Sequence, residues 1–297
     1  MKSTIRPSAA DRLFDLSIYA FMTAVLIVVL YPLYFVVIGS FSDPDAIYEG
    51  RAWLLPADTT LEGYRRIFRD GSVWSGYANT ILYAVVGTTV NVCLTIPAAY
   101  SLSRKDLRGR KGIAFFITFT MLFSGGLIPT FLLVKQLGLY NGIGAMVLPG
   151  AVSVWNLIIA RTFFQTSLPD ELLDSAMMDG CSNAQFFFRI ALPLSGALTA
   201  IMVLFYSVWH WNSFFDALIY LQDEKRYPLQ LVLRNILIAN QVSDSMLSDM
   251  TSVAEQQRVA DLIKYGVIIV ASVPMLMLYP FLQKYFVKGV MIGAVKG

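Results

Sequence analysis

The stretch Glu171–Pro193, ELLDSAMMDGCSNAQFFFRIALP, decides the fold, because it is polar enough for water and yet lies between strongly apolar segments. Just before it, Ser167 is placed to cap a helix that has Pro169 and Asp170 in its opening turn. Proline is preorganised for that turn, and a carboxylate there meets the positive end of the helix dipole. The sequence therefore predicts that a first short helix starts after Ser167.

Gly180 is expected to end this helix, because glycine adopts a left-handed backbone conformation at little cost. Ser182 and Gln185 then have the Ser-x-x-Gln spacing of a capping box, which predicts a second helix that continues to Pro193. Residues 167–193 are therefore predicted to form a helical hairpin attached to a much more apolar protein.

The composition of the 297-residue chain excludes an ordinary soluble domain. Its mean hydropathy is +0.60, 56% of its residues are hydrophobic and 14% are charged, whereas soluble domains carry about 25% charged residues. A membrane-spanning helix needs about 20 apolar residues. We therefore predict an all-α polytopic membrane protein with six transmembrane helices, at roughly 14–41, 78–102, 113–136, 144–164, 194–221 and 265–287.

Basic residues in short loops predict the orientation, because they stay on the cytoplasmic side of a membrane. The linker 104–111, RKDLRGRK, has five Lys or Arg and one Asp, and basic residues also lie near both ends of the chain. Both termini and the hairpin are therefore expected in the cytoplasm, and the loops at about 43–76 and 222–262 outside. No repeat divides the chain, so we expect one domain, 1–297, with its core at about 77–287.

The hairpin also carries a family resemblance. Asp174-Ser175-Ala176, three residues, Gly180, nine residues and then Ile190-Ala191-Leu192-Pro193 resemble the EAA loop of ATP-binding-cassette (ABC) importer permeases, E-A-A-x3-G-x9-I-x-L-P. The departures are Asp174 for the usual Glu and Ser175 for the first Ala. In that family the loop is the coupling helix, which sits in a cleft of the cytoplasmic ATPase subunit. The alternative is an amphipathic hairpin at the membrane interface without a partner.

Other motifs are similar to the carbohydrate branch of these permeases, of the MalG-like and LplC-like type. They are spread over nearly the whole chain: Asn79-Thr80, AYSLSR at 99–104, Ile128-Pro129-Thr130, Trp211-Asn212 and YPLQLVLRNIL at 227–237. The EAA-like spacing is specific, whereas Asn-Thr or Trp-Asn alone would be weak. The resemblance implies the MetI/MalG-like permease fold.

The resemblance implies coupling roles for residues of the hairpin. Ala176, Met177 and Gly180 are expected to sit in the ATPase cleft, with Asp174 and Asp179 at its rim, although a solvated acidic stripe would explain the charges equally well. The residues expected to couple the chain to the ATPase are Glu171, Asp174, Ser175, Ala176, Met177, Asp179, Gly180, Ile190, Leu192 and Pro193. The last three are expected to join the hairpin rigidly to the fifth span.

The resemblance also implies a set of partners and a location. They are a homologous second permease, two ATPase subunits, an extracytoplasmic solute-binding protein, an oligosaccharide or polysaccharide fragment, and the lipid bilayer of a bacterial cytoplasmic membrane. Nucleic acid is not expected. The chain has no Walker A pattern, so we expect it to be a transport subunit and not an enzyme, with ATP and Mg bound by the partner ATPases. No cofactor or metal site is expected in this chain.

A few polar and aromatic residues inside the predicted spans suit a sugar path. Amides bond to hydroxyl groups, and aromatic rings accept the apolar faces of sugars. The candidates are Asn79, Trp155, Asn156, Trp211 and Asn212. Hydrogen bonding between helices is the alternative for each of them, because Asn commonly joins neighbouring spans.

Two other classes of membrane protein fit the sequence less well. An ion-coupled secondary transporter predicts charged residues near the middle of the membrane and paired broken helices, and the sequence offers little of either. An intramembrane hydrolase would need a nucleophile for His210, the only histidine, and the sequence has no Gly-x-Ser-x-Gly motif.

Overall fold

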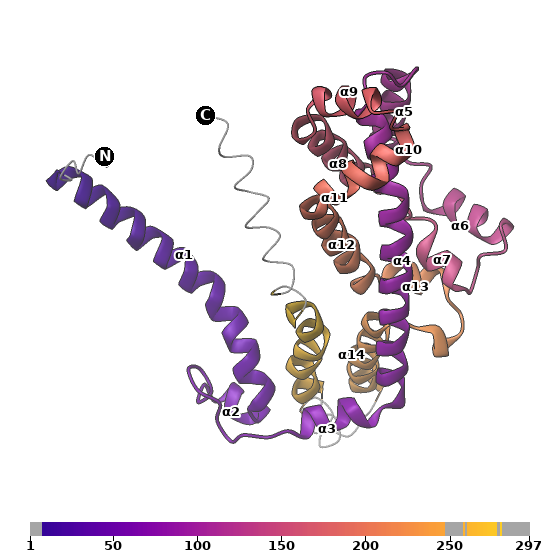
Figure 1. Ribbon diagram of the computed structural model, residues 1–297. Coiled ribbons are helices and arrows are strands. Elements are labelled where there is room, and N and C mark those ends of the chain that lie inside the picture. The colour runs from indigo at the N-terminus through magenta and orange to yellow at the C-terminus, as the bar shows by residue number, and fades with distance from the viewer. Residues whose placement is uncertain (1–7, 247–257, 259, 278–279, 281–297) are drawn as a thin grey trace. The chain divides into compact units, whose positions relative to one another are not determined.

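The computed structural model describes residues 8–246, 258, 260–277 and 280, and these residues form helices without any β-strand among them. The α-helices, labelled in Figure 1, are α1 (Ala9–Phe41), α2 (Pro44–Tyr48), α3 (Glu62–Arg69), α4 (Gly71–Ser103), α5 (Arg110–Leu122), α6 (Leu127–Gln136), α7 (Ile143–Val147), α8 (Val154–Ser167), α9 (Asp170–Met178), α10 (Asn183–Phe186), α11 (Leu192–Leu194), α12 (Gly196–Trp211), α13 (Phe215–Tyr220) and α14 (Leu229–Met246). A π-helix, η1 (Phe187–Ala191), precedes α11, and a 3₁₀ turn, η2 (Glu224–Arg226), precedes α14. One further helix covers Ala260–Met277. The predicted all-α class is therefore confirmed.

Three described helices are long and apolar enough to cross a membrane: Ala10–Phe41, Gly71–Ser103 and Ala260–Met277. Two further candidate spans are broken, because α5 and α6 meet at 114°, and the helical run Asn183–Leu194 meets α12 at 78°. The first break has a local cause, since Gly126 has φ +86° and only glycine adopts such a conformation freely. The described residues thus give three spans, or five if each bent pair is one span. The count of six stays a prediction, and most of 278–287 lies outside the described residues.

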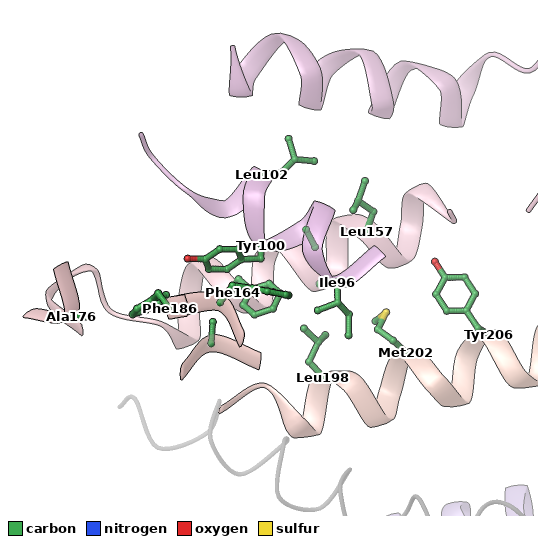
Figure 2. Packing of buried hydrophobic residues seen from close by; sticks show 14 residues of the cluster. Ile96, Tyr100, Leu102, Leu157, Phe164, Ala176, Phe186, Leu198, Met202 and Tyr206 are labelled. Atoms are coloured by element: carbon green, nitrogen blue, oxygen red, sulfur yellow. The ribbon is translucent and has the colours of Figure 1, made fainter. Parts of the chain in front are cut away.

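The chain forms two compact groups, each with its own contacts: residues up to Arg69 with Ile236–Ala271, and Asp70–Asn235 with the residues from Ser272. In the second group α4 packs along both α8 and α12. Figure 2 shows the core that these helices share, with Tyr100 from α4, Phe164 from α8, and Met202 and Tyr206 from α12. This core positions the hairpin.

Buried polar side chains join the same three helices. Asn91 donates from its amide to the carbonyls of Gly150 (2.9 Å) and Ala151 (2.8 Å), just before α8, and its Oδ1 lies 2.7 Å from Nε2 of His210. Because both amide hydrogens are used on carbonyls, Oδ1 must accept, so Nε2 of His210 carries the hydrogen. The Thr95 and Tyr206 hydroxyls are 2.7 Å apart and tie α4 to α12 a turn further along.

The first group is built on the end of α1. Asp43 caps α2, and Arg258 binds the carboxylates of Asp43 at 2.7 Å and Asp45 at 3.2 Å. The Tyr48 hydroxyl bonds to the Asp261 carboxylate, which raises the pKa of Tyr48 to about 12. Arg258, which precedes the helix Ala260–Met277, and Asp261 within it therefore join that helix to the loop that follows α1.

Replacement of Gly87 with alanine tests the tight contact between α4 and α12. A Cβ at position 87 would overlap the His210 ring, which Asn91 holds in place, so we expect a loss of roughly 1–3 kcal/mol of stability from overpacking. Thermal unfolding of the purified protein should show a lower Tm. Gly112→Ala in α5 is the matched control, because a Cβ there meets nothing within 4 Å. Equal Tm values for the two variants would contradict the packing argument.

Candidate coupling hairpin and path

The first arm of the hairpin is α9, and it begins later than the sequence suggested. Ser167 is the last residue of α8 and caps nothing in α9, so the predicted cap is wrong. Pro169 occupies the N-cap position, and Leu168 before it is extended at φ −111°, ψ 105°. Proline disfavours helical geometry in the residue that precedes it, so the chain leaves α8 at this point. Asp170 opens α9 as predicted.

The turn at Gly180 confirms the predicted helix end. Gly180 has φ +79°, its N–H bonds to the Met177 carbonyl at 3.0 Å, and the Cys181 N–H bonds to the Ala176 carbonyl at 2.9 Å. These two bonds are the Schellman motif, which satisfies the last carbonyls of a helix and needs a left-handed residue. Any side chain at position 180 would strain this turn.

The second arm starts at the predicted capping box. Ser182 accepts from the Gln185 N–H, and Gln185 Oε1 accepts from the Ser182 N–H at 2.9 Å. The helix then widens into the π-helix Phe187–Ala191 ahead of Pro193, which has no N–H to donate. At the 78° bend, the buried Ser195 hydroxyl donates to the carbonyls of Ala191 (2.8 Å) and Leu192 (3.0 Å).

An aromatic cluster seats the hairpin on the end of α4. The ring of Tyr100 lies 5.6 Å from that of Phe164, 6.4 Å from that of Phe186 and 5.0 Å from that of Phe187. Figure 2 shows Tyr100, Phe164 and Phe186 gathered here, with Ala176 of α9 on the same cluster. Both arms of the hairpin therefore share a core with α4 and α8.

The outer face of α9 differs in part from the predicted one. Ala176 is 8% exposed and faces the chain's own core, whereas Met178, which was not predicted, is 89% exposed. The other predicted residues lie as follows: Glu171, Asp174, Ser175, Met177, Asp179, Gly180 and Pro193 are exposed, and Ile190 and Leu192 pack partly against the core. Met178 lies four residues after Asp174 and seven after Glu171, and this helical spacing could have identified it.

A cavity of about 680 Å³ lies between α9 and the 104–111 linker. At its edge Lys105 pairs with Asp170, and Arg104 grips Asp106 with two bonds of 2.8 Å. The bond to Asp170 raises the pKa of Lys105, and the bonds from Arg104 lower the pKa of Asp106, so Lys105 and Asp106 stay charged at neutral pH. The charged rim links the hairpin to the end of α4.

The predicted path residues do not gather at one place. Asn79 donates to the carbonyls of Lys225 (2.7 Å) and Tyr227 (3.1 Å), so its amide ties α4 to the segment around η2. Trp211 and Asn156 are 4% and 7% exposed, whereas Trp155 is 60% exposed and Asn212 lies at the surface. The contacts of Asn79 therefore agree with the alternative role, in which its side chain joins neighbouring segments by hydrogen bonds.

A second cavity of about 600 Å³ lies at the junction of α12 and α13. Its lining combines aromatic rings with polar groups: Phe205, Val208, Trp209, Asn212, Ser213, Phe214, Phe215 and Asp216. The Trp209 ring packs on Gly150 and lies edge-on to His210 at 4.7 Å, so the Asn91 network fixes its position. The path residues predicted from the sequence did not include Trp209, although it lies three residues before Asn212, the C-cap of the same helix.

Comparison with known proteins gives close full-length relatives, although no family model matches the chain. The chain is 41% identical over 288 residues to the Bacillus subtilis polygalacturonan/rhamnogalacturonan transport system permease protein YtcP, which covers 97% of this chain and 99% of the relative. It is 39% identical to the B. subtilis protein LplC, over 99% of this chain and 98% of the relative.

A solved structure is similar over almost the same length. It comes from a bacterial ABC transporter involved in the import of the acidic polysaccharide alginate, with a TM-score of 0.81 and 29% identity, over 94% of this chain and 98% of the other. These likenesses confirm the suspected family, its membrane location and its role as a transport component. The chain belongs to the permease family of carbohydrate ABC importers.

Proposed function

We propose that this chain, together with a second permease, forms the path for acidic oligosaccharides derived from polysaccharides. The observation that carries the proposal is the 41% identity over 97% of the chain to a permease named for polygalacturonan and rhamnogalacturonan. The similar structure belongs to an importer of another acidic polysaccharide. The activity proposed for the complete importer is the uptake of these oligosaccharides, with energy supplied by separate ATPase subunits.

The hairpin 167–193 is proposed as the EAA coupling loop. Glu171, Asp174 and Met178 project from one exposed side of α9 and would meet the ATPase, while Ala176 holds α9 to the core. Gly180 and Asp179 form the exposed turn. Ile190, Leu192 and Pro193 lie in the run that leads to α12, so a displacement of the hairpin would be passed to that helix.

The remaining parts of the importer are proposed by analogy with the family. Two ATPase subunits would bind ATP and Mg, because this chain has no Walker A pattern. A solute-binding protein would deliver the sugar to the outer side. The chain itself would act as one permease domain, 1–297, with six spans and both termini in the cytoplasm, in agreement with its basic linker.

The cavity at the α12–α13 junction is proposed as part of the sugar path. Trp209 is 41% exposed and Phe215 is 52% exposed, so both rings are accessible to the apolar face of a sugar. Asn212 donates its Nδ2 to the Val208 carbonyl at 2.9 Å, which leaves Oδ1 as an acceptor for a hydroxyl group. Trp155 remains a candidate by its exposure.

The complete importer in proteoliposomes, with its binding protein saturating, should take up labelled oligogalacturonate in preference to a neutral oligosaccharide of the same length.

In the same uptake assay, Trp209→Leu should raise the KM for uptake roughly tenfold, the equivalent of about 1.4 kcal/mol of lost ring contact. Phe215→Ala should act in the same direction. Trp74→Leu is the control, because Trp74 is 59% exposed and outside the cavity. Preference for the neutral sugar would contradict the substrate class, and unchanged KM values would contradict the site.

Met178→Glu should uncouple the hairpin from the ATPase, because a carboxylate would be buried without a partner in the cleft. We expect ATPase activity stimulated by the binding protein to fall by about tenfold or more, with membrane insertion unchanged. Asn183→Glu, exposed on the other arm, is the matched control. Normal stimulation in the Met178 variant would show that this face does not meet the ATPase.

Single cysteines test the orientation in a background without Cys93 and Cys181, the two natural cysteines. Arg108→Cys in the basic linker should react with a membrane-impermeant maleimide only in inside-out vesicles, and Ser72→Cys only in intact cells. Both positions are exposed. Labelling of position 108 from outside would reverse the topology and exclude docking to a cytoplasmic ATPase.

A further inference from the structure

The loop after α1 turns back along that helix. The Tyr34 hydroxyl donates to the carbonyl of Leu54 at 2.7 Å, and the Tyr31 hydroxyl donates to the carbonyl of Trp53 at 3.4 Å. Both tyrosines lie well before the end of α1 at Phe41. The segment 53–55 therefore lies beside the apolar part of α1, and two of its backbone carbonyls are bonded by side chains of that helix.

The tip of this loop is apolar and exposed. Trp53, Leu54 and Leu55 are 59%, 49% and 72% exposed. Their neighbour Ala52 is buried, and its N–H bonds to the Ala46 carbonyl at 3.3 Å, so the loop has a fixed conformation while its large apolar side chains project outward.

The charged side chains of the loop lie at its neck, which we define as residues 49–51 and 57–58, on either side of the tip. Arg51 bonds to Glu49 at 2.7 Å and to Asp58 at 2.6 Å, so one guanidinium pairs with two carboxylates. The neck is closed by the Ala57 N–H, which donates to the Ser42 hydroxyl at 3.2 Å. The charged and polar groups of the loop thus lie before and after the apolar tip.

The exposure of α1 changes at the same level. Leu33 and Tyr34 are 62% and 45% exposed, whereas Ile38 is 2% exposed within its own group of contacts. From Asp15 to Tyr34 the helix rises about 28 Å at about 1.5 Å per residue, which matches a hydrocarbon layer of about 30 Å. The tyrosines therefore mark the level at which the hydrocarbon would end.

We propose that Trp53, Leu54 and Leu55 form an interfacial anchor that inserts into the bilayer at the Phe41 end of α1. Trp and Tyr are enriched at membrane interfaces, and backbone carbonyls enter an apolar layer only when they are bonded within the protein. The tyrosine hydroxyls meet that requirement for the carbonyls of Trp53 and Leu54. The anchor fixes the depth of α1, in whose most apolar stretch only 6% of the residues are buried.

The lipid bilayer is the occupant that these observations favour. The surface of α1 next to the tip is itself apolar and open, so lipid that covers the helix would also cover the tip. No charged side chain interrupts the tip, so it would enter the bilayer interface without burying a charge. The proposal does not depend on the sugar or on the coupling loop.

Spin labels in the assembled importer test the anchor. Leu55→Cys and Leu54→Cys are made in the background without Cys93 and Cys181, and the complex is placed in lipid nanodiscs. Labels at both positions should collide with oxygen more than with a water-soluble nickel chelate. Leu26→Cys in the apolar part of α1 is the lipid-facing control, and Thr59→Cys beyond the neck is the water-facing control, since both residues are exposed.

Each outcome decides the question, provided that the labelled complex keeps its stimulated ATPase activity. The anchor is supported if, at both tip positions, the ratio of oxygen collisions to nickel-chelate collisions is close to the ratio at Leu26. Ratios like those of Thr59 would place the tip in water or against the binding protein. Exclusion of both reagents would place it in a protein interface with the second permease, and either of these results would overturn the proposal.

Discussion

The side-chain amide of Asn91 is the interaction on which the rest of the core depends. It donates hydrogen bonds to the two carbonyls that precede α8, and its oxygen accepts one from His210 of α12. One residue of α4 therefore holds both neighbouring helices. Inside a membrane an unpaired amide or carbonyl costs several kcal/mol. The positions of α8 and α12, and of Trp209 between Gly150 and His210, follow from this requirement.

The hairpin depends on α4 in a different way. Tyr100 packs against Phe164, Phe186 and Phe187, which come from α8 and from the second arm of the hairpin. The same helix therefore fixes the cavity at α12 and α13 through hydrogen bonds and the hairpin through ring contacts. Between the two lie the π-helix and the bend at Ser195, whose hydroxyl and backbone N–H both donate to the carbonyls of Ala191 and Leu192.

Local signals in the sequence predicted the hairpin well. The Gly180 turn and the box of Ser182 and Gln185 depend on residues close in sequence, and both were confirmed. The predicted cap at Ser167 was wrong, because Pro169 disfavours helical geometry in the residue before it and α9 therefore starts at Asp170. The apolar runs predicted the long helices but not the breaks at Gly126 and Ser195, since hydropathy carries no information on the direction of the helix axis. Side-chain exposure was the least predictable feature, because the burial of Ala176 and Trp211 is set by residues distant in sequence.

The ties between α4, α8 and α12 consist of amides, hydroxyls, carbonyls and an imidazole that donates from one nitrogen. None of these bonds joins opposite charges. The electrical potential across a membrane does about 2.3 kcal/mol of work per elementary charge for each 100 mV, and it does that work only on charge that moves. A rearrangement confined to these bonds would displace no formal charge. The energised state of the membrane would therefore neither favour nor oppose it, whatever the voltage of the cell.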